Sequence, residues 1–244
     1  MGKIIRNILI LLYIIAMSGY IIFAFVKFHN SDNDALCNDV RVDIKDSTQL
    51  QFVRSENIIK LLKEQKKFPL EKRISEIDLF AIEEMLNKIP AIKRAECYRT
   101  EDHCIRIDIY QRKPIFRVMS GSYNFYIDEE KKEIPIPRKF AANVPIVTGE
   151  VNKDFIKGDL FDFITYVRKN QFWDAQIEQI NICHQKNVEL IPRVGNHTIR
   201  LGTLDDYETK LNKLKTFYKN LHNIGWNQYH IINLEYKNQV VCTK

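Results

Sequence analysis

Two adjacent pairs of residues in this sequence have side chains that could carry out acid–base or thiol chemistry. Asp205 and Asp206 form an acidic pair, and Cys183 and His184 place a thiol beside an imidazole. An acidic pair directly before an amphipathic run is more typical of a helix cap that also complements the helix dipole. Neighbouring residues in a strand point to opposite faces, so Cys183 and His184 are not expected to activate each other. Neither pair predicts a catalytic site.

The short motifs that accompany common enzyme chemistry are absent from the sequence. It contains no G-x-S-x-G nucleophile elbow, no H-E-x-x-H zinc motif, no phosphate-binding loop and no glycine-rich dinucleotide turn. The six histidines are scattered and no two cysteines have C-x-x-C spacing, which argues against zinc. We therefore expect no catalytic residues, no cofactor and no metal.

The cysteines are expected to be buried thiols. Their number is odd, so at least one is unpaired even in an oxidising compartment. Opposed residues of a hairpin share a face, and matching the apolar faces places Cys97 opposite Ile105 and turns Cys104 to the other side. We predict no disulfide between Cys97 and Cys104. The five are Cys37, Cys97, Cys104, Cys183 and Cys242.

A long stretch without charge, Ile8 to Val26, lies near the start of the sequence, and the large region that follows it is polar. At about 1.5 Å of rise per residue it can cross a hydrocarbon core of about 30 Å as one helix. The alternatives are a buried core helix, which seldom lacks charge on every face, and a cleaved signal sequence, whose apolar part usually covers only about 7 to 15 residues. We expect an uncleaved anchor. Lys3 and Arg6 favour a cytoplasmic tail and an extracytoplasmic body.

The charge pattern beyond the anchor argues against nucleic-acid binding. The chain has a formal net charge of +6 and 28% charged residues, but basic and acidic residues alternate along most of it. No stripe of Arg and Lys is interleaved with stacking aromatic residues. We predict a solvated surface and no nucleic-acid partner.

The region after the anchor has the pattern of strand, helix, helix, strand, strand. Val40, Val42 and Ile44 alternate with charged residues, Ser55 and Asp78 are placed to cap two helices, and Pro90 ends the second. Ile92 to Arg99 and Cys104 to Gln111 form a hairpin. Two helices on one face of a three-stranded sheet would bury the apolar positions.

Beyond Pro114 short strands dominate. We predict an α+β fold overall, in which this second domain is mostly antiparallel with flanking helices. The expected segments are a tail at 1–7, a transmembrane helix at 8–26, a linker at 27–36 and domains at 37–113 and 114–244. In the second domain we expect a hairpin of 116–119 with 124–128, a strand at 144–148, a helix at 155–169, strands at 177–183, 188–192 and 198–201, a helix from Tyr207 to Leu221, and a last hairpin of 231–236 with 239–243.

Three short motifs in this order carry a family resemblance. Pro90 to Glu96 reads P-x-I-K-x-A-E, Gln111 to Ile115 reads Q-R-x-P-I, and Val144 to Gly149 reads V-P-I-V-T-G. With the anchor and the βααββ unit, these make the whole chain resemble the FtsQ/DivIB cell-division family, whose first extracytoplasmic module is a POTRA domain. One departure is the turn at Glu129 to Glu133, where relatives commonly have glycine.

The resemblance implies a non-enzymatic scaffold of the bacterial division machinery. Such proteins bind small single-span coiled-coil proteins of the FtsB/DivIC and FtsL type and other divisome proteins, and help to regulate septal peptidoglycan synthesis. It implies a single-pass protein of the inner (cytoplasmic) membrane, concentrated at the septum, with residues 8–26 in the bilayer. In relatives the partner contact lies on the terminal strands, here 232–236, with Tyr236 in the family's aromatic position.

The residues of the final hairpin give a separate reason to expect a partner there. If the strand at 239–243 is the edge of its sheet, its unpaired backbone groups could template a partner strand. The alternative is that Tyr236 and Val240 are ordinary core residues. The candidate partner-binding residues are Ile232, Leu234, Tyr236, Gln239, Val240 and Val241.

A second contact is considered in the first module, through its sheet edge or through the surface of its second helix at Glu83, Glu84 and Lys88. A solvated helix face explains these three residues equally well.

Two other functions remain open from the sequence: a POTRA-containing factor for protein export or outer-membrane assembly, and an anchored peptidoglycan hydrolase. The lack of internal repeats argues against the former, and the lack of nucleophile and metal motifs against the latter.

Overall fold

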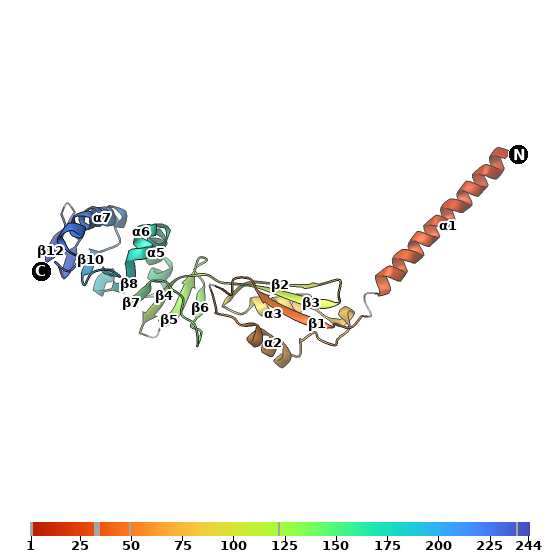
Figure 1. Ribbon diagram of the computed structural model, residues 1–244, viewed down its shortest axis with the longest axis horizontal. Helices are drawn as coiled ribbons and strands as arrows, with labels where there is room; N and C mark the ends of the chain where they lie inside the picture. Colours follow the sequence, from red (N-terminus) through yellow and green to blue (C-terminus); the bar gives the residue numbers. More distant parts are fainter. Residues whose placement is uncertain (1, 32–34, 49, 122, 238) are drawn as a thin grey trace. The chain divides into compact units, whose positions relative to one another are not determined.

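The computed structural model describes residues 2–31, 35–48, 50–121, 123–237 and 239–244 (Figure 1). Its contacts divide the chain into two compact units. The first unit comprises Met1–Ser47 and Val53–Tyr110, and the second comprises Thr48–Phe52 and Gln111–Lys244. The short segment Thr48–Phe52 therefore packs with the second unit although it lies between elements of the first.

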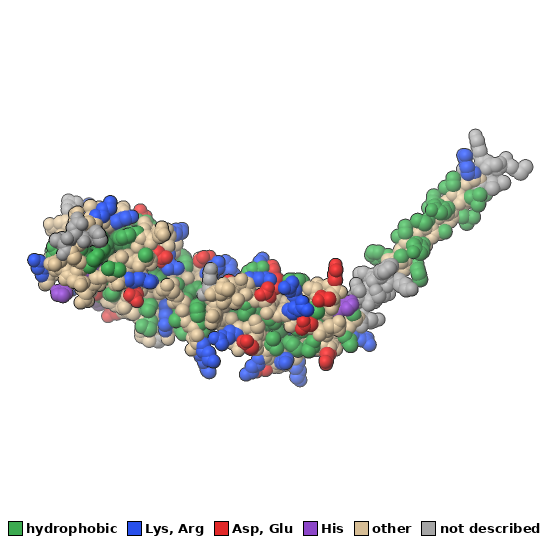
Figure 2. All heavy atoms as spheres, in the orientation of Figure 1, with side chains coloured by type: hydrophobic (Ala, Val, Ile, Leu, Met, Phe, Trp, Pro, Cys, Tyr) green, Lys and Arg blue, Asp and Glu red, His purple; other side chains and the backbone are tan. Residues whose placement is uncertain are grey.

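The apolar N-terminal stretch is a single helix, α1 (Gly2–Ser31). Its window Ile8–Phe25 has a mean hydropathy of 2.5 and none of it is buried within the protein. Figure 2 shows hydrophobic side chains along the described length of this helix. The helix is long and apolar enough to cross a membrane. The expected linker at 27–36 is partly wrong, because α1 continues to Ser31; residues 32–34 lie outside the described part.

The first unit has the predicted strand–helix–helix–strand–strand order. Strand β1 (Asp39–Ile44) is followed by α2 (Ser55–Glu64), the short 3₁₀ helix η1 (Ile74–Glu76), α3 (Leu79–Asn87), β2 (Ile92–Arg99) and β3 (Cys104–Gln111). The strands lie in the order β1-β3-β2, and β1 runs parallel to β3. Helices α2 and α3 lie on one face of this sheet (Figure 1), where the apolar residues of β2 and β3 are buried.

Only one of the two predicted helix caps in this unit is correct. Asp78 precedes α3, and its Oδ1 accepts a hydrogen bond from the Ala81 amide at 2.9 Å. Ser55 is instead the first residue of α2, and its Oγ donates to the Val42 carbonyl at 3.4 Å. The N-cap of α2 is Arg54, which makes no capping hydrogen bond. Because Ser55 is already helical, its hydroxyl contacts strand β1 rather than the end of its own helix.

The second unit contains one nine-stranded sheet in the order β12-β11-β10-β9-β8-β7-β4-β5-β6. Antiparallel pairs outnumber parallel ones, which are β10 with β11, β4 with β7, and β7 with β8. The strands are β4 (Pro114–Ser120), β5 (Tyr123–Asp128), β6 (Glu133–Pro135), β7 (Ile146–Gly149), β8 (Ile177–Ile182), β9 (Val188–Pro192), β10 (Thr198–Gly202), β11 (Ile231–Asn233) and β12 (Val241–Thr243).

Helices of the second unit lie along one face of this sheet (Figure 1). They are α4 (Lys153–Lys157), α5 (Asp159–Lys169), α6 (Gln171–Gln176) and α7 (Tyr207–Ile224). Together with the sheet they enclose one apolar core, which includes Phe116, Phe163, Trp173 and Leu214. The single helix predicted at 155–169 is wrong, because the chain breaks at Gly158, whose backbone is not helical (φ −103°, ψ −119°).

Helix α7 begins at Tyr207 as predicted and buries the predicted apolar face, but the predicted side-chain cap is missing. Leu211, Leu214 and Leu221 are buried, as their spacing indicates. Asp206 occupies the N-cap position in a left-handed conformation (φ 52°), and its side chain makes no capping hydrogen bond. Asp205 Oδ2 accepts a hydrogen bond from Thr203 Oγ1 at 2.9 Å. Of the acidic pair, Asp205 therefore stabilises the loop before the helix, and Asp206 occupies the N-cap position through its backbone only.

The turn between β5 and β6 forms without the glycine that relatives commonly have. Asp128 Oδ1 accepts hydrogen bonds from the amides of Glu130 at 2.9 Å and Lys132 at 2.7 Å. Lys131 takes the left-handed conformation itself (φ 61°). An aspartate that bonds its own following backbone stabilises a turn in this way, so Asp128 offsets the strain at Lys131.

Candidate partner-binding edge

Strand β12 forms one edge of the nine-stranded sheet. Its register with β11 pairs Ile231 with Thr243, Ile232 with Cys242 and Asn233 with Val241. Among the strands that the structure describes, β12 has β11 as its one hydrogen-bonded neighbour. A strand with one neighbour presents a row of backbone groups along which another strand can add.

The opposite edge of the same sheet is protected. Strand β6 ends at Pro135, and Pro137 follows two residues later. Proline has no amide hydrogen to donate to a ladder and is typical of blunted edges. Glu133 of this strand is held by Lys153 at 3.2 Å and Lys157 at 3.0 Å. These features leave β12 as the more receptive edge.

Two of the predicted partner-binding residues are core residues. Ile232 and Leu234 are fully buried, and Val240 and Cys242 also pack against the core while remaining partly exposed. Alternation along the extended chain explains this, because Val240, directly before β12, and Cys242 share one face, and Val241 lies on the other. The side chains of Ile232 and Leu234 are therefore not accessible to a partner.

The remaining candidates lie on the surface beside β12. Tyr236 is 50% exposed and Val241 is 40% exposed, while Gln239 is also exposed. Gln239 and Val240 line one side of a shallow groove of about 560 Å³, and α7 lines the other side with residues that include Lys213 and Phe217. The structure therefore brings an exposed aromatic ring, an exposed valine and an open groove to the same edge.

Residues that sequence patterns did not single out hold this edge in place. Lys213 Nζ on α7 donates to the carbonyls of both Tyr236 and Lys237 at 3.0 Å. Asn233 Oδ1 accepts from the Glu235 amide at 2.8 Å. The only sequence signal for Lys213 was its place on the polar side of an amphipathic helix, which does not reveal a carbonyl 23 residues further along the chain.

The second contact considered in the first unit is not one continuous free surface. Glu83 Oε1 accepts a hydrogen bond from the Cys97 amide of β2 at 2.6 Å. Glu84 and Lys88 form an exposed ion pair at 2.7 Å, one helical turn apart. Glu83 is thus engaged with its own sheet, whereas Glu84 and Lys88 form a solvated pair.

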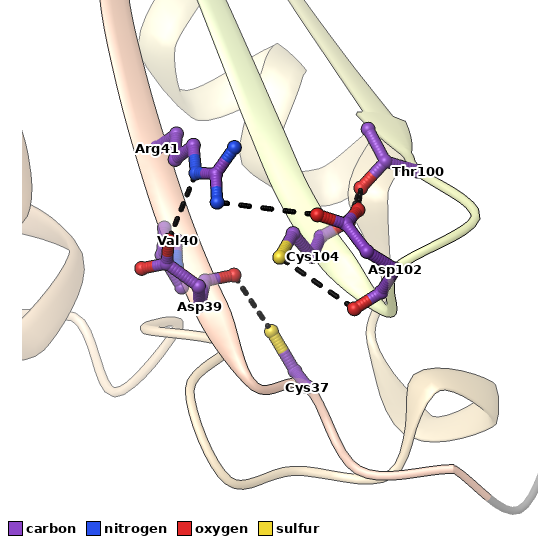
Figure 3. A network of polar contacts seen from close by, with 7 residues as sticks. All are labelled: Cys37, Asp39, Val40, Arg41, Thr100, Asp102 and Cys104. Atoms are coloured by element: carbon purple, nitrogen blue, oxygen red, sulfur yellow. Dashed lines mark hydrogen bonds and ion pairs between the residues drawn. The ribbon is translucent and has the colours of Figure 1, made fainter.

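A polar network at one end of the first unit includes two of the cysteines (Figure 3). Arg41 lies between Asp39, at 2.9 Å, and Asp102, at 3.9 Å. The hydrogen bond from the Arg41 guanidinium holds the pKa of the Asp39 carboxyl below its usual value. Cys37 Sγ donates to the Asp39 carbonyl at 3.3 Å, and Cys104 Sγ donates to the Asp102 carbonyl at 3.7 Å. The network ties the start of β1 to the turn between β2 and β3.

The environment of the cysteines does not favour nucleophilic chemistry. All five are free thiols, and Cys37, Cys97 and Cys104 are buried. Burial raises the pKa of each of these thiols, and the pKa of Cys97 reaches about 12. A thiol reacts as its thiolate, so these groups stay protonated near neutral pH. Within the described residues, no three His, Cys, Asp or Glu side chains gather as metal ligands.

Comparison with protein families identifies both units. A family model described as FtsQ/DivIB, C-terminal related matches residues 113–243, more than half of the chain. The chain belongs to the FtsQ/DivIB family. A second model, a POTRA-like domain, matches residues 35–110. No curated protein matches the chain. The resemblance and the fold class predicted from sequence are therefore confirmed, and the FtsQ/DivIB match supports a role of the divisome type.

Proposed function

We propose that this FtsQ/DivIB protein is a membrane-anchored, non-enzymatic scaffold of the division machinery that receives a partner chain at strand β12. The family match supports the divisome role, and the exposed edge of the nine-stranded sheet is the observation on which the binding mode rests.

The anchor of this scaffold is helix α1. An 18-residue window with no charged residue and a mean hydropathy of 2.5 satisfies the length and composition of a membrane span. The basic residues that precede it favour a cytoplasmic tail, with the two units outside the membrane. As a member of the division machinery, the protein lies in the inner membrane and is concentrated at the division septum.

The partners are small single-span coiled-coil proteins of the FtsB/DivIC and FtsL type. An extended segment of the partner adds to β12 through backbone hydrogen bonds, and the side chains of Tyr236 and Val241 contribute apolar contact. Gln239, which is exposed two residues before Val241, lines the groove against α7. Through these partners the scaffold helps to regulate septal peptidoglycan synthesis.

The experiment that tests this function is capture of the co-expressed FtsB/DivIC-type partner by the full chain. Tyr236→Ala removes the exposed ring, and Val241→Pro disturbs backbone pairing at the edge strand. Each is expected to reduce capture at least tenfold, because edge addition depends on an unobstructed ladder. Val194→Ala and Met119→Ala are matched controls, since both side chains are exposed apolar groups on other strands or loops of the same unit.

Unchanged capture by a folded Val241→Pro variant would refute strand addition at β12. Loss of capture by the two controls would instead indicate a broad apolar surface. Thermal unfolding of each variant shows whether the second unit remains folded.

A further inference from the structure

The first unit has its own sheet edge at β2, and side chains of α3 cover it. Strand β2 is the last strand in the order β1-β3-β2. Ala95 N donates to Asn87 Oδ1 at 2.8 Å, and Cys97 N donates to Glu83 Oε1 at 2.6 Å. Both amides therefore point away from β3, and each is bonded to a side chain instead of to another strand.

The spacing of the acceptors matches the spacing of the amides. Glu83 and Asn87 are four residues apart on α3 and so lie on one face of the helix. Ala95 and Cys97 are two residues apart on β2, and their side chains are buried. Helix α3 packs on β2, which brings both acceptors over the strand edge. Two acceptors from one helix thus satisfy consecutive outward amides of one strand.

The sequence of β2 is complementary to itself in antiparallel pairing. A two-fold axis through Ala95 would place Arg94 of one chain opposite Glu96 of a second copy. Arg94 and Glu96 now form an ion pair at 3.1 Å within one chain, and their side chains are 58% and 43% exposed. In the same register the outward amide of Ala95 would face its counterpart, as a hydrogen-bonded antiparallel pair requires. A second copy of this chain is therefore the occupant that the exposed charges fit, and a two-fold contact is the usual form of such pairing.

We propose that Glu83 and Asn87 act as an edge guard that prevents β2 from pairing with β2 of a second copy. An uncovered edge is a template for such pairing, and the guard removes two of the amides that it would use. The guard concerns the first unit alone, so it does not depend on whether a partner binds β12.

The guard is tested with the full chain in detergent micelles by sedimentation equilibrium. The double variant Glu83→Ala/Asn87→Ala is expected to dimerise with a dissociation constant at least tenfold lower than that of the unchanged chain. Alanine has the highest helix propensity, so α3 itself is retained. The single variants Glu83→Ala and Asn87→Ala are expected to lie between the two. They supply the same comparison if the double variant does not fold.

Matched controls separate the guard from general effects on α3. Glu84→Ala/Lys88→Ala removes an exposed ion pair of the same helix turn and is expected to leave self-association unchanged. Glu83→Gln keeps an acceptor oxygen for the Cys97 amide and is expected to keep the protein as monomeric as the unchanged chain. Hydrogen exchange of the Ala95 and Cys97 amides reports whether the edge has been uncovered.

A charge reversal tests the register. Adding Arg94→Glu to the double variant places glutamate opposite Glu96 of the second copy and is expected to abolish the dimer. Adding Glu96→Arg as well restores opposite charges and is expected to recover it. The proposal is overturned if the double variant stays monomeric while its two amides exchange faster. It is also overturned if the dimer that forms is indifferent to Arg94→Glu.

Discussion

Arg112 Nη1 lies 2.7 Å from Asp128 Oδ2, and the two side chains are only 14% and 4% exposed. Arg112 follows β3 directly, whereas Asp128 ends β5 and supplies the hydrogen bonds of the next turn. This ion pair links the entry of the second unit to the turn between β5 and β6.

Removing Arg112 is expected to destabilise the second unit strongly. Arg112→Ala leaves the buried Asp128 carboxylate without its closest cation, which costs roughly 3–5 kcal/mol in buried pairs. Asp128→Asn in the same chain is expected to recover part of the loss, since it removes the uncompensated charge. Denaturant unfolding provides the measurement. Arg117→Ala is the control, because its partner Asn124 is exposed and uncharged. If Arg117→Ala lowers the free energy of unfolding as much as Arg112→Ala does, the explanation is contradicted.

His197 is expected to make the second unit less stable in mild acid. Its Nε2 lies 2.8 Å from Tyr218 Oη, and the ring is buried. Burial lowers the pKa of His197, an effect partly opposed by the backbone carbonyl of Trp226. The unfolded chain then binds more protons below its own pKa of about 6.5, so stability falls as the pH drops from there toward the folded-state pKa.

The measurement for His197 is the melting temperature between pH 7.5 and pH 5. His197→Gln retains a polar contact for Tyr218 but cannot titrate, so its melting temperature should fall less over this range. Equal slopes for the two proteins would rule out His197 as the source.

Gly149 is expected to tolerate no side chain. Its φ is +90°, and a Cβ there would lie 2.0 Å from the Ile182 carbonyl oxygen of the neighbouring strand β8. Gly149→Ala should therefore cost more than the roughly 1–3 kcal/mol of left-handed strain alone, because backbone must move. Gly121→Ala is a matched control with φ +52° and nothing within 4 Å. Unfolding free energies that are equal for the two variants would contradict the steric explanation.

Lys213 is expected to hold the segment before β12. Lys213→Ala removes two hydrogen bonds to the carbonyls of Tyr236 and Lys237. Amide exchange of residues 236–243 should rise severalfold as this segment loosens, with little change in β8 and β9. Lys219→Ala, an exposed position on the same helix, should leave exchange unchanged, and an equal effect there would assign the change to charge alone.

Strongly periodic segments were predictable from sequence, and features set by distant residues were not. Strands β2 and β3 have the predicted bounds because alternating apolar residues fix one buried face. The break at Gly158 was missed because apolar residues on both sides continue a helical period. Ser55 was misassigned because a serine before a helix resembles a cap whether it is the last extended residue or the first helical one.

The candidate edge was only partly predictable for the same reason. Alternation indicates which residues of a strand share a face but not whether that face is buried by other elements, so Ile232 and Leu234 resembled Val241. The parallel pairing of β11 with β10 and the Lys213 contacts join segments more than 20 residues apart. Local patterns carry no information about them.

The most direct test of the scaffold account is hydrogen exchange of the full chain with and without the FtsB/DivIC-type partner. The account predicts slower exchange at the amides of residues 239–244 on binding, with the β6 amides of Glu133 and Ile134 unchanged. Bound partner that leaves 239–244 unprotected, or that protects β6 instead, would contradict it.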